Sequence, residues 1–297
     1  MFISLDRLGK DFDKKPCALD DLTLDLPSGM IGLIGPNGAG KTTLMRILCG
    51  IVSPTRGHVL VDGRDIAEPR NRRALKKTLG YLPQDIEPYP NLTPPEFLDY
   101  VGILKGMDDK RERRRQADEL IERVGLADVR RRRIGGFSGG MRRRVGIAQA
   151  LMGDPRLLVV DEPTAGLDPK ERVRFRNLIA SFAQDKIVIL STHIVSDVEY
   201  VADEILVMRA GAFIMQGAPT DIVATVTGKV WECHVDARRA DELAAASCVS
   251  NVHYAADGHA VARVVADEAP VAGARALDPT LEDVYLYVFR DEVVPLS

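Results

Sequence analysis

Closely spaced cysteines, long apolar runs and an excess of charge of one sign are all missing from this sequence. The cysteines are far apart and include no C-x-x-C pair, which argues against a zinc ribbon and a disulfide framework; they are Cys17, Cys49, Cys233 and Cys248. Lysine and arginine number 40 against 43 aspartates and glutamates, and the net charge of −3 argues against a wholesale coat of nucleic acid. The 297 residues are 45% hydrophobic and 28% charged, which is typical of one large globular domain or two of ordinary size.

A membrane-spanning segment is also missing from the hydrophobic pattern. The longest candidate, residues 210–220, is too short to cross a bilayer and carries two glycines. Near the N-terminus, Asp6 and Arg7 occupy positions where a signal peptide needs apolar residues. We therefore expect a cytoplasmic protein with no transmembrane segment of its own.

Residues 1–220 show the pattern of an α/β domain. Residues 22–26 alternate apolar and polar side chains, as a half-buried strand does. Three short apolar runs are typical of buried parallel strands: 30–34, 157–160 and 187–190. Helical patterns follow glycine-containing loops at 44–48 and 145–151, and a hairpin turning at Gly211 is expected to close the domain.

Strand patterns are missing between residues 90 and 136. Charged helical patterns at 95–105 and 110–124 take their place. We therefore predict a helical subdomain at about residues 90–150, inserted into the α/β core.

The composition changes after residues 217–219, and residues 221–297 are predicted to form a small α/β accessory domain. Short alternating segments indicate strands at 230–235, 249–255 and 260–265, and an alanine-rich helix is expected near 239–246.

Arginine clusters occur at 111–115, 130–133 and 142–144. Solvated helix faces are the favoured interpretation, and contact with acidic partner loops or with lipid headgroups is the alternative.

Residues 35–42, GPNGAGKT, match the pattern G-x-x-x-x-G-K-[ST] between an apolar strand and a helix, the context that supports a phosphate-binding loop. Glycines let backbone N–H groups surround phosphates, and the following helix adds the positive end of its dipole. Lys41 should reach the β- and γ-phosphates, and the Thr42 hydroxyl should bind Mg²⁺. The predicted nucleotide-binding residues of this segment are Gly35, Pro36, Asn37, Gly38, Ala39, Gly40, Lys41, Thr42 and Thr43.

Two adjacent carboxylates, Asp161 and Glu162, follow the apolar run 157–160. A buried strand delivers them to its carboxyl end, where ligands bind in open α/β sheets. Asp161 is placed to hold the Mg²⁺ shell, and Glu162 is placed to polarise the water that attacks the γ-phosphate. The two motifs together predict hydrolysis of a nucleoside triphosphate.

Further motifs resemble those of the ABC-transporter ATPases, in the family's order and over residues 2–220. Residues 137–141, FSGGM, resemble the signature loop, with Met141 in place of the usual glutamine. Residues 161–168, DEPTAGLD, resemble the acidic motif running into the D-loop. The other matches are Gln84 to the Q-loop glutamine, His193 to the switch histidine and Phe12 to an aromatic that stacks on adenine.

The resemblance implies an α/β P-loop NTPase fold of the ABC cassette type, with a mixed sheet core, and an enzyme that hydrolyses ATP with Mg²⁺. In the family, the signature loop contacts the γ-phosphate held by the opposite subunit, so a second cassette, identical or related, is an expected partner. The implied nucleotide contacts are Ser138, Gly139, Gly140, Asp168 and Phe12; the implied catalytic residues are Glu162, His193, Gln84 and Lys41; the implied Mg²⁺ residues are Thr42, Gln84 and Asp161.

Other classes with the same cassette fit the sequence less well. The interval between Lys41 and Ser138 is too short for the long coiled coils of chromosome and break-repair ATPases. Excision-repair relatives carry zinc-binding cysteine pairs, and translation factors carry two cassettes in one chain. A non-catalytic regulatory cassette would be expected to lose Glu162 or Lys41.

Residues 279–286, PTLEDVYL, resemble a C-terminal phrase of exporter ATPases that serve drugs, antibiotics, polysaccharides or sodium. An amphipathic capping helix is the plainer interpretation of this segment. The resemblance implies an integral-membrane permease as partner, export as the favoured direction, and a peripheral position at the cytoplasmic face of the cell membrane. No nucleic-acid partner is expected.

Overall fold

The computed structural model describes residues 1–13, 15–164 and 168–290. The chain forms two compact units, one of Met1–His193 with Val201–Ile214 and one of Ile194–Tyr200 with Met215–Ser297. A boundary at residue 220 between an ATPase domain and an accessory domain stays a prediction. Within the described ranges, no helix is long and apolar enough to cross a membrane.

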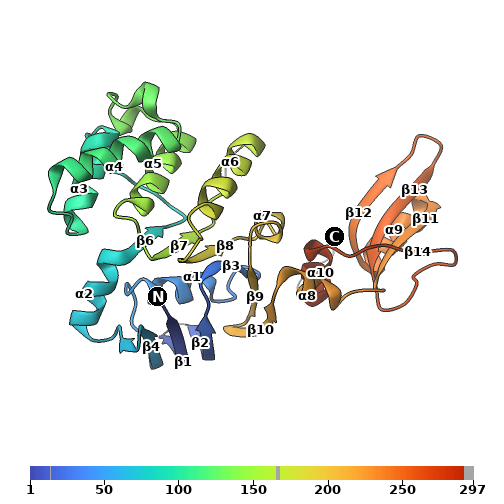
Figure 1. The fold of residues 1–297 in the computed structure, drawn as a ribbon. Helices are drawn as coiled ribbons and strands as arrows, with labels where there is room; N and C mark the ends of the chain where they lie inside the picture. The colour runs from blue at the N-terminus through green and yellow to red at the C-terminus, as the bar shows by residue number, and fades with distance from the viewer. Residues whose placement is uncertain (14, 165–167, 291–297) are drawn as a thin grey trace. The chain divides into compact units, whose positions relative to one another are not determined.

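A six-stranded sheet forms the centre of the first unit, in the order β10-β9-β3-β8-β7-β6 (Figure 1). Strands β9, β3, β8, β7 and β6 pair in parallel. Every residue of β7 and β8 is buried, because helices or a second sheet cover both faces of a parallel sheet. The bounds are β3 Gly29–Ile34, β6 Leu79–Leu82, β7 Leu157–Asp161, β8 Ile187–Ser191, β9 Glu204–Arg209 and β10 Ala212–Gly217.

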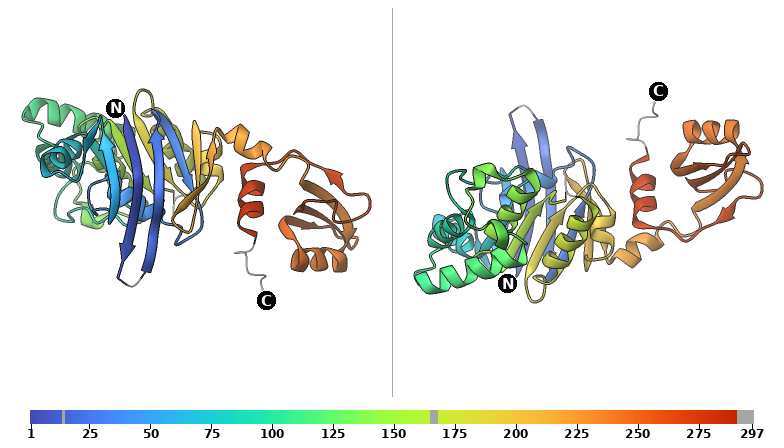
Figure 2. Two further views of the ribbon diagram at one scale, coloured as in Figure 1. Left: turned by 90° about the horizontal axis from the view of Figure 1, so that it is seen from below. Right: turned by 90° about the horizontal axis from the view of Figure 1, so that it is seen from above.

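An antiparallel sheet in the order β2-β1-β4-β5 forms a second layer, whose long blue strands run side by side in Figure 2. Helix α1 (Lys41–Leu48) shares one hydrophobic core with both sheets, in which Leu44 and Met45 pack with Leu5 of β1 and Val159 of β7. The bounds are β1 Ile3–Phe12, β2 Lys15–Leu26, β4 Arg56–Val61 and β5 Arg64–Asp65. The α/β fold with a mixed sheet core is therefore confirmed.

Helices α3, α4 and α5 gather into one group beside the central sheet (Figure 1). Helix α3 begins at a capping box, in which Glu96 accepts hydrogen bonds from the backbone N–H and hydroxyl of Thr93, both at 2.8 Å. The bounds are α2 Pro69–Thr78, α3 Pro94–Leu104, α4 Lys110–Arg123, α5 Gly139–Leu151 and α6 Pro169–Ala180, with single 3₁₀ turns at Ala127–Val129 and Ile134–Gly136. The helices expected at 95–105 and 110–124 begin and end within one residue of those positions.

The interpretation of the arginine clusters as solvated faces is wrong for two of their members. Arg113 is 7% exposed and Arg143 is 8% exposed. Arg113 donates to Asp99 at 2.8 Å and to the Met107 carbonyl at 2.6 Å, so these partners compensate its burial. Buried arginines are difficult to predict within a run of arginines, because helical periodicity directs only some side chains of the run toward the interior.

The second unit has its own antiparallel sheet, in the order β12-β13-β11-β14, and its own small core around Cys233, Leu243, Ala262 and Val264. All four cysteines of the chain are free thiols. The bounds are α7 Ser196–Glu199, α8 Pro219–Ala224, β11 Val230–Asp236, α9 Ala237–Ala246, β12 Cys248–Tyr254, β13 His259–Val265, β14 Arg275–Ala276 and α10 Leu281–Val288.

Helix α10 contains most of the C-terminal phrase and begins at a capping box formed by Thr280 and Asp283. Asp283 is almost fully buried and accepts hydrogen bonds from Arg263. The backbone N–H of Leu281 donates to Glu199 of α7 at 2.9 Å. The C-terminal helix is thereby held to a short helix that follows His193 in the chain.

Candidate functional site

The loop between β3 and α1 is built from glycines that no other residue could replace without strain. Gly40 has a φ of 106°, and a Cβ there would lie 2.6 Å from the Ala18 carbonyl oxygen. A Cβ on Gly35 would lie 2.2 Å from the carbonyl oxygen of Met208. Strands β2 and β9 therefore press directly against the loop, while Asn37 and Gly38 at its tip are exposed.

The turn between β9 and β10 is hydrogen-bonded to this loop. The N–H of Gly211 donates to the Ala39 carbonyl at 2.9 Å, and the Gly211 carbonyl accepts from Asp20 at 3.0 Å. The sequence indicated Gly211 only as a hairpin turn. Its contact with the loop depends on a distant strand, so no local pattern announces it.

Lys41 begins α1 and is 6% exposed. Its ammonium donates to the carbonyl oxygens of Gly35 at 2.6 Å and Pro36 at 2.9 Å. Burial lowers the pKa of Lys41, and the negative charges of Glu162 and Asp161 oppose that shift. Thr42 and Thr43 follow in the same helical turn and are half-buried.

Asp161 and Glu162 lie where β7 ends beside β8. Asp161 is 2% exposed and pairs in register with Ser191, whose hydroxyl donates to Asp161 Oδ1 at 2.7 Å. Glu162 has a φ of 44°, and its N–H donates to the Ser191 carbonyl at 3.0 Å. A left-handed backbone conformation is strained at a residue with a long side chain, and such strained residues occur most often at functional sites.

His193 lies against the Glu162 carboxylate, with 3.1 Å between His193 Nδ1 and Glu162 Oε2. The Glu162 side chain is 13% exposed and that of His193 is 52% exposed. The structure thus brings together the predicted acidic pair and the predicted switch histidine at the carboxyl ends of adjacent parallel strands.

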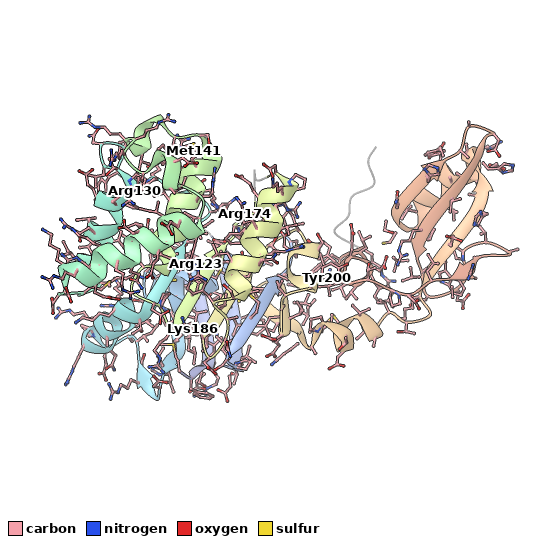
Figure 3. The ribbon with its side chains drawn as sticks, turned by 45° about the horizontal axis from the view of Figure 1, so that its top comes forward. Arg123, Arg130, Met141, Arg174, Lys186 and Tyr200 are labelled. Atoms are coloured by element: carbon pink, nitrogen blue, oxygen red, sulfur yellow. The ribbon has the colours of Figure 1, made fainter. Side chains whose placement is uncertain are left out.

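Ser138 caps the N-terminus of α5, and its hydroxyl oxygen accepts a hydrogen bond from the Met141 N–H at 3.2 Å. Phe137 is buried and anchors the loop, whereas Ser138 and Gly139 are exposed. A Cβ built on Gly139 would meet no atom within 4 Å, and one on Gly140 would lie 3.2 Å from Glu171. Figure 3 labels Met141 at this end of α5. The loop presents an exposed helix N-terminus, which is suited to an anion.

Three further residues were predicted to contact the nucleotide or Mg²⁺, and each lies on a different element of the chain. Gln84 is exposed. Phe12, at the end of β1, is 44% exposed, and the ammonium of Lys10 lies 4.9 Å from its ring centroid. Asp168 caps α6 through a bond of 2.8 Å from the Glu171 N–H. The D-loop residues 165–167 lie outside the described residues. Contacts of Gln84, Phe12 and Asp168 with a nucleotide stay predictions.

Two residues of the site were missed at the level of sequence, Ser191 and Arg143. Ser191 ends β8 and Asp161 ends β7, and each follows four apolar residues. This shared pattern is the signal from which the pairing of the two residues could have been predicted. Arg143 donates to backbone carbonyls on both sides of the site, but it stands within an arginine run that resembles an exposed helix face.

The donor chemistry here suits Mg²⁺. Thr42, Asp161 and Gln84 offer a hydroxyl, a buried carboxylate and an amide oxygen, and Mg²⁺ prefers hard oxygen ligands, with one or two carboxylates completed by phosphates and water. Asp161 keeps one oxygen in a hydrogen bond from Ser191, which orients the carboxylate. In the described part of the chain there is no cluster of three or more His, Cys, Asp or Glu that could hold a metal ion by itself.

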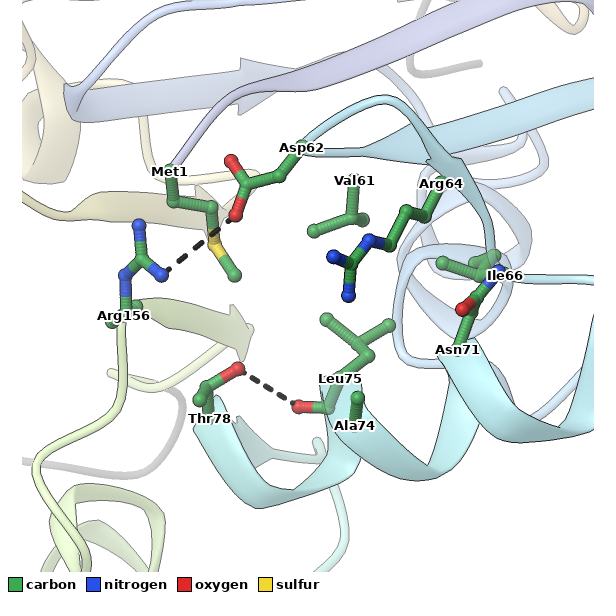
Figure 4. A pocket seen from close by; sticks show the side chains of 10 residues that line it. All are labelled: Met1, Val61, Asp62, Arg64, Ile66, Asn71, Ala74, Leu75, Thr78 and Arg156. Atoms are coloured by element: carbon green, nitrogen blue, oxygen red, sulfur yellow. Dashed lines mark hydrogen bonds and ion pairs between the residues drawn. The ribbon is translucent and has the colours of Figure 1, made fainter.

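A separate cavity of about 250 Å³ lies between β4, β5 and α2 (Figure 4). Asp62 on its rim accepts from the Phe2 N–H at 2.8 Å and lies 3.7 Å from Arg156. No residue of the predicted site lines this cavity.

Comparison with known proteins places these motifs in a family. A family model described as ABC transporter matches residues 19–165. The chain is 33% identical to an uncharacterized ABC transporter ATP-binding protein of Synechocystis sp., over 98% of this chain and 84% of the relative. It is 34% identical to the daunorubicin resistance ATP-binding protein DrrA3 of Streptomyces coeruleorubidus, over 94% and 93%. A solved ATP-binding subunit of an ABC transporter superposes with a TM-score of 0.67 and 26% identity, over 76% of this chain and 93% of that one.

Proposed function

The chain belongs to the ATP-binding proteins of ABC transporters, and from this premise we propose that it hydrolyses ATP to power transport through a separate membrane permease. The observation that carries the proposal is the strained Glu162, whose carboxylate contacts His193 beside the buried Asp161. A carboxylate held at the carboxyl edge of the sheet, next to a phosphate-binding loop, is placed to act on a water molecule.

The phosphate groups of ATP would lie within the loop 35–42, against the first turn of α1. Lys41 can exchange its bonds with the Gly35 and Pro36 carbonyls for bonds with the phosphates, at little cost in unpaired donors. Thr42, Gln84 and Asp161 would hold Mg²⁺, which neutralises phosphate charge when bound. The exposed ring of Phe12 would stack on the adenine.

In the proposed reaction, a water oxygen forms a bond to the γ-phosphorus while the bond from that phosphorus to the β–γ bridging oxygen breaks. Glu162 orients this water and accepts its proton. His193 orients Glu162 and donates a hydrogen bond to the γ-phosphate. The products are ADP and inorganic phosphate.

One phosphate loop and one signature loop are present in the chain, so we propose that two cassettes pair and that each signature loop completes the site of the other. The exposed Ser138 and Gly139, with open space in front of Gly139, support this arrangement. The match to a daunorubicin resistance protein and the phrase at 279–286 support export, with the chain peripheral at the cytoplasmic face of the membrane.

The proposal predicts that Glu162→Gln keeps ATP binding but lowers turnover by roughly 10²–10⁴-fold, because the amide cannot accept the proton. The variant should also accumulate an ATP-bound dimer. Phosphate release by the purified protein and size-exclusion chromatography with ATP measure the two effects. Lys41→Ala serves as the inactive control for contaminating ATPase. Hydrolysis by Glu162→Gln at near the parent rate would exclude Glu162 as the base.

A further inference from the structure

Arg143 makes a set of contacts that the proposed mechanism does not use. Among the residues that the structure describes, its three guanidinium nitrogens donate to backbone carbonyl oxygens alone, and these belong to the loop after β6 and to the end of β7 with the loop that follows it. Nε donates to Pro163 at 3.0 Å, Nη1 to Pro83 at 3.3 Å and to Gln84, and Nη2 to Asp161 at 3.2 Å and to Glu162.

These contacts match the full donor capacity of the side chain. A guanidinium carries five N–H groups in a rigid planar fork, and five carbonyl oxygens surround this one. The side chain is 8% exposed, so water cannot readily replace a lost bond. A lysine has the charge but not the fork, and its ammonium could reach only part of this set.

The two loops are the ones expected to act on ATP. One carries Gln84, and the other carries Glu162 directly after Asp161, the last residue of β7. Arg143 itself lies on α5, five residues after Ser138, which caps that helix and forms the signature loop. One side chain therefore joins the signature helix to the backbone of both loops.

The bond to Glu162 bears on its strained backbone. Glu162 has a φ of 44°, and such a conformation persists only where neighbouring groups hold it. Its N–H is held by the Ser191 carbonyl and its carbonyl by Arg143. Without Arg143, one of these two restraints is lost and the carboxylate can leave its contact with His193.

We propose that Arg143 is a positioning residue that couples the two ATP sites of the dimer. Through its five bonds, the signature loop, which serves the opposite subunit's ATP, moves as one body with Glu162 and Gln84, which serve the chain's own ATP. Closure of the signature loop at one site thereby sets the catalytic carboxylate at the other. This inference rests on the proposed function, since it requires a cassette dimer with shared sites.

The first test compares Arg143→Lys and Arg143→Met with the parent chain in steady-state ATP hydrolysis. Both variants should lower kcat about 10- to 100-fold, leave the KM for ATP within about threefold, and lower the Hill coefficient from above 1 to about 1. A residue needed only for folding would lower the active fraction and leave the Hill coefficient unchanged. Parent values of kcat and Hill coefficient in Arg143→Lys, or a parent Hill coefficient of 1, would overturn the coupling.

Arg144→Met is the matched control, because Arg144 lies on the same helix, donates to the Gly125 carbonyl at 2.9 Å and pairs with Glu171 at 3.5 Å, and so makes its contacts outside the two loops. Its kcat should stay within about threefold of the parent. ATP binding to the monomer should be retained in every variant, since the phosphate loop is unchanged. An Arg143 variant that loses monomer ATP binding in proportion to kcat would also contradict the proposal.

A second measurement does not depend on catalysis and separates this proposal from the proposed function. Hydrogen–deuterium exchange of the full-length Arg143→Lys protein should increase in peptides covering 83–86 and 161–164 and stay unchanged at 137–141. Unchanged exchange in the first two segments would overturn the role of Arg143 even if the chain hydrolyses ATP. A parent chain without ATPase activity would contradict the proposed function, while increased exchange would still support the restraint.

Discussion

At the scale of single residues, the site depends on a few buried polar contacts. Asp161 is almost fully buried, and its hydrogen bond from Ser191 compensates part of the cost of taking a carboxylate out of water. Ser191 itself is 0% exposed, so no water can take the place of its hydroxyl without rearrangement. The pair therefore contributes both to stability and to the orientation of the carboxylate.

We predict that Ser191→Ala lowers the free energy of unfolding by about 1–3 kcal/mol, because a buried carboxylate loses a donor. It should also weaken the Mg²⁺-dependent part of ATP affinity, since Asp161 becomes free to rotate. Urea denaturation and ATP titration with and without Mg²⁺ measure these effects. Ser181→Ala is the control, because Ser181 lies at the exposed end of α6, where its hydroxyl donates to the nearby Leu178 carbonyl at 2.7 Å and accepts an exposed bond from Arg123 at 3.3 Å. Equal stability of the two variants would contradict the prediction.

At the scale of elements, Lys105 joins the C-terminal ends of two helices. It follows α3 directly, and its ammonium donates to the carbonyl oxygens of Ala150 and Met152 at the end of α5. A cation at a helix C-terminus is favourable, but burial lowers the pKa of Lys105 to about 8.

This shift predicts a pH dependence of stability. Below about pH 8 the lysine is protonated in both the folded and the unfolded chain. Between pH 8 and its ordinary value near 10.5, only the unfolded chain keeps the proton, so raising the pH favours the folded state. The free energy of unfolding of the parent, minus that of Lys105→Met, should therefore increase from pH 7.5 to pH 10, by on the order of 1 kcal/mol. Denaturation curves at both pH values measure it, and a constant difference would refute the shift.

At the scale of the whole molecule, the signature loop is exposed in the single chain, with Ser138 and Gly139 at the surface. Gly139 has open space in front of it, so a side chain there can be accommodated in the monomer. In a dimer of the proposed kind, that space would be taken by the γ-phosphate of the opposite site. The effect of a substitution at Gly139 should therefore depend on dimerisation.

We predict that Gly139→Asp folds and binds ATP as a monomer but fails to form the ATP-bound dimer. A carboxylate close to the γ-phosphate repels it strongly in a partly desolvated site. ATP affinity and size-exclusion chromatography measure the two properties, with Glu162→Gln as the background that traps the dimer. Gly139→Ala is the control for bulk without charge and should dimerise more than Gly139→Asp. A trapped dimer in the Gly139→Asp, Glu162→Gln protein would show that the loop does not act across an interface.

The limits of prediction from sequence are visible in single elements. The strand predicted at 22–26 is the last part of β2, which begins at Lys15. The first half of β2 could not be predicted from an alternating pattern, because its side chains do not alternate between the two faces. Cys17 and Asp21 have φ values of 60° and 50°, and the register with β1 shifts along this part of the strand. The strands at 30–34, 157–160 and 187–190 were predictable because a fully buried parallel strand is a continuous apolar run.

Sequence alone was enough to identify the phosphate loop, the acidic pair, the signature loop and the family, because each motif is a short run whose residue types contain the chemistry. The groups that restrain these motifs became identifiable only from the folded chain. The bond from Ser191 to Asp161, the contact of His193 with Glu162 and the burial of Arg143 arise from the register of parallel strands and from helix packing. Such contacts join residues that are distant in the chain. The hydrophobic pattern of a single strand or helix is the same whichever strand pairs with it or whichever helix packs on it, so the local sequence does not predict these contacts.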